Sequence, residues 1–89
     1  MSRYAVSSDV ACALVDDGAV LLHLGNKRYY SLNETGTFIW QSLEEGRNVS
    51  DMVARLQRDY EVDQEEAQQS VDRLLGELGD AGLIASSSE

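Results

Sequence analysis

The chain has 89 residues, of which 43% are hydrophobic, so it can bury one small core and is not wholly disordered. Its formal net charge of -9 would repel a phosphate backbone and argues against binding of DNA or RNA. The single cysteine excludes an internal disulfide framework, and no apolar run approaches the length of a membrane span or a signal-peptide core. These features predict a cytoplasmic protein that does not enter a membrane.

The first part of the chain predicts a three-stranded antiparallel meander. Residues 10–15 and 19–24 are rich in β-formers and flank the turn signal Asp16-Asp17-Gly18. A short Gly25-Asn26-Lys27 connection leads into a third strand at residues 28–32. Residues 1–6 are expected to be poorly ordered or to form an edge segment.

Neighbouring side chains of the third strand must point to opposite faces of the sheet. We expect Tyr30 to pack inward together with Leu32, and Tyr29 to be exposed. The same two-residue period, applied to the expected strand at residues 19–24, places Leu21 and His23 on one face of the sheet.

Three amphipathic helices are expected after the sheet. Asn33 is a good N-cap for the first, which ends near Gly46, and Ser50 is the expected N-cap of the second. Asp63 with Glu66 forms a capping-box pattern for the third. The apolar positions of the third helix recur at helical spacing and predict a buried stripe of Ala67, Val71, Leu74 and Leu78. Leu75 is expected beside this stripe.

The fold class is therefore α+β, a three-stranded antiparallel sheet followed by three helices, similar in plan to a winged helix-turn-helix. Leu83 and Ile84 are expected to close the core, and residues 85–89 to form a flexible polar tail. Residues 1–89 are interpreted as a single domain with its core at about residues 10–84.

No group of residues predicts catalysis, a metal site or a bound cofactor. The single His23 and the single Cys12 lack neighbouring motifs for a nucleophile and its base, and no metal-ligand spacing is present. The glycines do not form a phosphate-binding loop. The expected catalytic, metal and cofactor residues are therefore none.

The order of these motifs resembles the PqqD-like family, the peptide-recognition elements of ribosomal natural-product pathways. The resemblance rests on Arg28-Tyr29-Tyr30-Ser31-Leu32-Asn33-Glu34-Thr35-Gly36, on Ile39-Trp40, and on Gly82-Leu83-Ile84 near the end. It implies a protein without catalytic activity that binds the leader segment of a precursor peptide. The leader adds to the third strand as a further strand and lies beside the third helix, where partner enzymes such as a leader protease or cyclase use it.

The chain departs from the family pattern in two ways. Ser70-Val71 stands where many members carry Asp-Val, so an acidic contact there does not carry over. The chain has no proline, and so lacks the Leu-Leu-x-Pro-Glu type of strand associated with pyrroloquinoline-quinone proteins. The Tyr-Tyr-Ser-Leu-Asn-Glu-Thr-Gly version looks more like the stand-alone leader-binding proteins of lasso-peptide pathways.

The resemblance assigns the peptide-binding site to the third strand and the third helix. Leu75 is expected to line a pocket because it lies off the main stripe, whereas Leu74 and Leu78 are expected to be ordinary core residues. Gly76 is interpreted as a position that either lets a peptide approach closely or simply tolerates drift. The candidate peptide-binding residues are Arg28, Tyr29, Tyr30, Ser31, Leu32, Val71, Asp72, Leu74, Leu75 and Leu78.

The expected partners are a basic or amphipathic leader and a leader protease or other modifying enzyme. Two alternatives share the predicted plan: a winged-helix DNA-binding regulator and a small protein-interaction subunit whose sheet edge pairs with itself. The acidic third helix, with one Arg and six acidic residues over residues 63–80, speaks against the first alternative. The second leaves the oligomeric state open between a monomer and a weak dimer.

Overall fold

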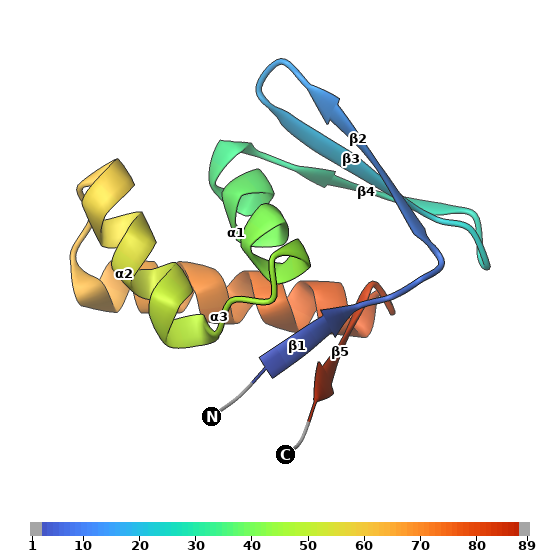
Figure 1. Ribbon diagram of the computed structural model, residues 1–89. Helices are drawn as coiled ribbons and strands as arrows, with labels where there is room; N and C mark the ends of the chain where they lie inside the picture. Colours follow the sequence, from blue (N-terminus) through green and yellow to red (C-terminus); the bar gives the residue numbers. More distant parts are fainter. Residues whose placement is uncertain (1–2, 88–89) are drawn as a thin grey trace.

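The computed structural model describes residues 3–87, which form two antiparallel sheets and three helices (Figure 1). One sheet contains, in spatial order, β2 (Val10–Val15), β3 (Gly18–His23) and β4 (Arg28–Leu32). The helices are α1 (Glu34–Glu44), α2 (Val49–Tyr60) and α3 (Gln64–Asp80). The second sheet pairs β1 (Arg3–Val6) with β5 (Ile84–Ser87). The predicted α+β class, a three-stranded sheet followed by three helices, is confirmed.

The ribbon of β1 and β5 is absent from the sequence-based prediction. Residues 85–87, expected in a flexible tail, pair with the N-terminal segment, and Ala85 lies opposite Ala5. The two strands are far apart in the sequence, so no local sequence pattern predicts that they pair. The serines of β5 are also weak β-formers. Residues 1–2 of the expected N-terminal segment and residues 88–89 of the expected tail lie outside the described residues.

The outer edge of β4 has no strand beside it within residues 3–87, because β4 ends the order β2-β3-β4. The direction of its main-chain groups follows from the register. Val15 and Gly18 pair across a two-residue turn, so they exchange hydrogen bonds, and successive residues of β3 then bond alternately to β2 and to β4. The 2.7 Å bond from the Leu24 N–H to the Asp9 carbonyl agrees with this alternation.

This alternation directs Arg28, Tyr30 and Leu32 of β4 toward β3, where they face His23, Leu21 and Ala19 respectively. The main-chain N–H and C=O groups of Tyr29 and Ser31 consequently point out of the open edge of the sheet. Two donors and two acceptors are thus available at this edge, at the spacing that a further strand requires.

The N-caps fix where the helices begin. Asn33 Oδ1 accepts a 2.7 Å hydrogen bond from the Gly36 N–H, and Asp63 Oδ1 accepts one of 2.8 Å from the Glu66 N–H, so both predicted caps are confirmed. The prediction of Ser50 as the cap of α2 is wrong. Asn48 takes that role, because its Oδ1 accepts a 2.8 Å bond from the Asp51 N–H and the helix therefore begins earlier.

The core lies between the inner face of the sheet and the three helices. Its largest fully buried side chains include Trp40 of α1, Met52 and Leu56 of α2, and Leu78 of α3. The predicted orientation of β4 is confirmed: Leu32 is buried, Tyr30 packs against the core, and Tyr29 is 75% exposed.

The buried face of α3 is turned from its predicted position. Ala67, Val71 and Leu78 are buried as expected, but the fourth buried residue is Leu75, at 5% exposure, and Leu74 is half-buried. Both leucines fit a helical stripe that starts at Ala67, so spacing alone does not choose between them. Because α3 packs against α2 and β5, the Leu75 side faces the core and the Leu74 side is left to face β4.

Gly18, at the first position of β3, is a strict steric requirement of the fold. A Cβ built there would lie 1.9 Å from the carbonyl oxygen of Leu32, which belongs to the backbone of the neighbouring strand and cannot swing aside. We expect Gly18→Ala to destabilise the protein by about 1–3 kcal/mol, as overpacking does. Urea unfolding followed by circular dichroism measures this change.

Gly76 supplies the matched control for this prediction. A Cβ there meets nothing within 4 Å, and the residue lies inside α3, so Gly76→Ala is expected to stabilise the protein by about 0.5–1 kcal/mol. Equal effects of the two substitutions would contradict the described packing at the end of β4.

Candidate functional site

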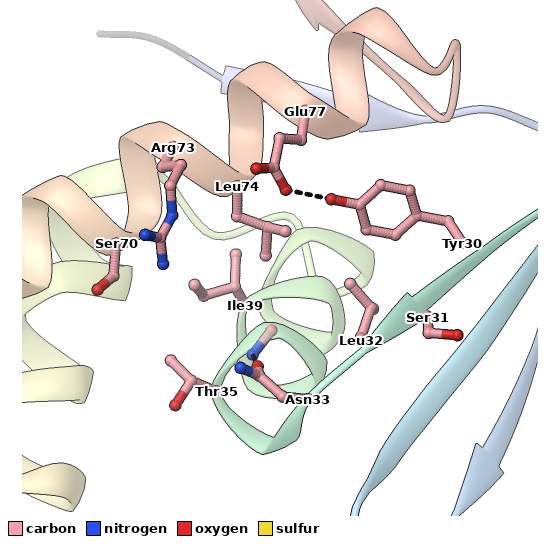
Figure 2. A pocket seen from close by; sticks show the side chains of 11 residues that line it. Tyr30, Ser31, Leu32, Asn33, Thr35, Ile39, Ser70, Arg73, Leu74 and Glu77 are labelled. Carbon is pink, nitrogen blue, oxygen red and sulfur yellow. Dashed lines mark hydrogen bonds between the residues drawn. The ribbon is translucent and has the colours of Figure 1, made fainter.

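A groove runs between β4 and α3, with the first turns of α1 at its base (Figure 2). It encloses about 350 Å³, and we call it the β4–α3 groove. The residues that line it come from these three elements: Tyr30, Ser31, Leu32, Asn33, Thr35, Gly36, Ile39, Ser70, Arg73, Leu74 and Glu77. The groove therefore adjoins the strand whose outer edge is unpaired.

The groove has an apolar floor and a polar rim. Leu32, Ile39 and Leu74 point toward one another across the floor, and Arg73 and Glu77 project from α3 at the rim (Figure 2). Among the described residues, Arg73 forms no ion pair. Such a surface suits an extended peptide that has apolar side chains on one face and polar ones on the other.

One hydrogen bond crosses the groove. The phenol of Tyr30 on β4 donates to Glu77 Oε1 on α3 (Figure 2). Burial, and next the bond to the Glu77 carboxylate, raise the pKa of Tyr30 to about 12. The bond ties the open strand to the helix, and a ligand in the groove must lie over it or displace it.

The raised pKa makes this contact measurable. Because the folded state favours the protonated phenol, Tyr30 contributes to the free energy of unfolding in full below about pH 10. This contribution is lost as the pH rises toward 12. We expect the absorbance change of Tyr30 near 295 nm, obtained as the difference between wild type and Tyr30→Phe, to have its midpoint well above pH 10. In Glu77→Gln the midpoint should fall, since the carboxylate charge is gone. An identical midpoint in Glu77→Gln would refute the Tyr30–Glu77 contact.

A second hollow, of about 330 Å³, lies on the other side of Tyr30. It is lined by the beginning of β4 and the end of α3: His23, Asn26, Arg28, Tyr29, Tyr30, Asp80, Ala81 and Leu83. Tyr30 lines both cavities, so the groove and the second hollow meet at this residue and lie along the same strand.

The structure brings together six of the ten candidate site residues. Four line the β4–α3 groove, namely Tyr30, Ser31, Leu32 and Leu74. Arg28 and Tyr29, together with Tyr30, line the second hollow. The Ser31 side chain points away from the groove, so this residue contributes its main chain (Figure 2).

The other four candidates lie elsewhere. Val71, Leu75 and Leu78 are core residues with at most 5% exposure, which corrects the assignment of Leu75 to a pocket and of Leu74 to the core. Asp72 lies outside both cavities, and its carboxylate accepts a 3.0 Å hydrogen bond from Gln68. Gly76 faces open space, so the structure gives no support to its interpretation as a point of close peptide approach.

Sequence reasoning missed the residues of α3 that form the wall of the groove. Ser70, Arg73 and Glu77 share with Leu74 the spacing i, i+3, i+4 and i+7, which defines one helix face. This signal was present beside the apolar stripe. The sequence-based prediction also omitted four groove residues at the start of α1, because these positions were assigned only to the core and to the helix cap. They are Asn33, Thr35, Gly36 and Ile39.

The described residues hold no cluster of His, Cys, Asp or Glu that could bind a metal ion. The imidazole of His23 has a local role, because its Nδ1 accepts hydrogen bonds from the Gly25 and Asn26 N–H groups and fixes the turn after β3. No helix within residues 3–87 is both long and apolar enough to span a bilayer.

Two solved structures resemble the chain over nearly its whole length. One is described as "TbiB1 in Complex with the TbiA(beta) Leader Peptide"; it is 30% identical, with a TM-score of 0.87, covering 96% of this chain and 99% of that one. The other is "Lasso peptide synthetase B1 complexed with the leader peptide", at 28% identity and a TM-score of 0.86, covering 93% and 98%.

The curated proteins provide no match to this sequence. The family model described as "Coenzyme PQQ synthesis protein D (PqqD)" matches residues 18–84, a span that contains β3, β4, all three helices and thus both walls of the β4–α3 groove. The chain therefore belongs to the PqqD family.

Proposed function

We propose that this protein binds the leader segment of a ribosomally made precursor peptide and presents it to the enzymes that mature it, in a lasso-peptide pathway. The observation that carries the proposal is the open edge of β4 beside a groove with an apolar floor. The likeness to two proteins described in complex with leader peptides supports it.

Binding proceeds by strand addition to β4. The outward N–H and C=O groups of Tyr29 and Ser31 bond to the main chain of the leader, which gives affinity with little demand on its sequence. Every second leader side chain then points toward α3 and enters the β4–α3 groove, and these side chains provide specificity.

The leader that fits this site is amphipathic. Its apolar side chains pack on Leu32, Ile39 and Leu74, and its polar groups reach Arg73 and Glu77 at the rim. The net charge of -9 adds a long-range preference for Lys and Arg in the leader, which speeds the encounter more than it strengthens the complex.

The protein carries out no chemistry of its own in this proposal. It holds the leader while a leader protease, cyclase or other modifying enzyme acts on the precursor, and it works in the cytoplasm as a single peptide-recognition domain comprising residues 1–89. A role in DNA binding is disfavoured, because residues 63–80 carry one Arg against six acidic residues.

Titration of the protein with the fluorescently labelled leader of the precursor encoded beside its gene tests the proposal. Fluorescence anisotropy is expected to give a sub-micromolar Kd, and a scrambled leader of the same composition is expected not to saturate. Equal binding of both peptides, or of neither, would contradict leader recognition.

A further inference from the structure

A second exposed surface lies on the opposite edge of the sheet from β4. The residues of β2 are uncharged and mostly exposed, and its outer edge has no strand partner within residues 3–87. Leu14 is 64% exposed and Val15 is 55% exposed, which makes them two of the four large apolar side chains exposed on the described chain. Figure 1 shows the β2–β3 turn projecting beyond the helices.

The uncovered part of β2 forms one wall of a hollow of about 280 Å³, which we call the β2–α1 notch. Leu14 pairs with the buried Ala19, so its side chain lies on the face of the sheet that the helices cover elsewhere. The opposite wall comes from α1 and α2, where the rings of Phe38 and Tyr60 meet edge to face at 5.8 Å. The notch therefore has apolar side chains on both walls, and no element within residues 3–87 covers them.

The rim of the notch is acidic. The ionisable carboxylates that line it are Asp16 and Asp17 of the β2–β3 turn and Glu34 of α1, and no Lys, Arg or His lines it. Burial, followed by the charges of Glu34 and Asp59, raises the pKa of Tyr60. The nearby cation Arg55 stacks on Phe38 at 5.2 Å and lies 3.4 Å from Glu45, so it does not neutralise the rim.

A second copy of this chain is a poor occupant. Antiparallel pairing of two β2 edges about the centre of the strand would bring Asp9 of one copy opposite Asp16 of the other, at both ends of the interface. Two molecules of charge -9 also repel each other at long range. The apolar centre and the acidic rim of the notch together suit a partner segment that has an apolar side chain between basic residues.

We propose that the β2–α1 notch binds a partner protein through a segment that carries an apolar side chain flanked by Lys or Arg, and that the partner is a maturation enzyme of the same pathway. The identity of the partner rests on the proposed function. The two linings share no residue, because Thr35, Gly36 and Ile39 of α1 face the β4–α3 groove while Glu34, Thr37 and Phe38 of α1 face the notch. The leader and the enzyme therefore bind at the same time.

The test uses the full-length protein, its purified leader protease and the labelled leader, with the two affinities measured separately. Leu14→Ser removes the exposed apolar side chain, and Asp16→Asn with Asp17→Asn removes two rim charges while keeping turn-forming residues. Each is expected to weaken protease binding about tenfold or more, as loss of an interface anchor does, with the leader Kd unchanged. Asp72→Asn, on α3 outside both surfaces, is the matched control and should change neither affinity.

Unchanged protease binding in Leu14→Ser and in the double variant would overturn the notch as the docking site. A concentration-dependent dimer in sedimentation velocity that Leu14→Ser dissociates would overturn it in favour of self-association. Failure of the proposed function looks different: wild type would not bind the leader, whatever its affinity for the protease.

Discussion

Ser31→Pro in β4 is expected to abolish most of the leader affinity while leaving the fold intact. The Ser31 N–H points out of the open edge, so its loss breaks no bond to β3, and proline is tolerated on edge strands in this orientation. The leader loses one main-chain donor and meets the pyrrolidine ring at the point of closest approach. An unsatisfied leader carbonyl costs about 1–3 kcal/mol, which corresponds to an increase of about fivefold to about 150-fold in Kd.

The controls for this substitution separate backbone from side-chain effects. Ser31→Ala keeps the N–H and should bind the leader as wild type does, because the side chain points away from the groove (Figure 2). Tyr30→Pro removes an N–H that faces β3 and is expected to lower the thermal midpoint. Anisotropy titration and thermal melts followed by circular dichroism provide both readouts. Normal leader binding by a folded Ser31→Pro protein would exclude strand addition at this edge.

Substitutions of two neighbouring leucines of α3 give the second large effect. Leu74 is expected to affect leader binding, and Leu75 the free energy of unfolding. Leu74→Asp places a charge on the floor of the β4–α3 groove, where the leader would bury it, and is expected to eliminate measurable leader binding with a modest change in stability. Leu75→Ala leaves a cavity beside the core and should cost about 2–5 kcal/mol of the free energy of unfolding.

Each variant serves as the control for the other. Leu75→Ala, kept below its thermal midpoint, should bind the leader with nearly wild-type affinity, since its side chain does not reach the groove. Urea denaturation and leader titration on both proteins complete the comparison. Leader binding lost in Leu75→Ala and kept in Leu74→Asp would reverse the assignment of the two residues.

Much of the three-stranded sheet and of the helical order follows from local chemistry. The two-residue period fixed which of Tyr29 and Tyr30 faces inward, and the side chains of Asn33 and Asp63 mark two helix starts. Asn48 was missed because Ser50 is an equally good cap by type, and the choice depends on which side chain reaches a free N–H.

The errors concern contacts between distant parts of the chain. The β1–β5 ribbon joins the two ends, and the rotation of α3 is set by what packs on it, so neither is legible from spacing within one helix or strand. Ser70, Arg73 and Glu77 form one wall of the groove. Polar residues at this helical spacing also occur on helix faces that simply contact solvent, so the sequence does not distinguish the two cases. The β4–α3 groove thus includes three of the candidate residues of β4, whereas most of its α3 wall was not among the candidates.

Amide hydrogen exchange followed by NMR tests most directly whether the leader binds as a strand along β4. If the leader binds in this way, saturating leader is expected to slow exchange at Tyr29 and Ser31, whose N–H groups point outward, by at least about tenfold. The Tyr30 amide, which already faces β3, should gain much less protection. Leader binding that leaves Tyr29 and Ser31 exchanging as fast as in the free protein would show that the leader does not bind as a strand along β4.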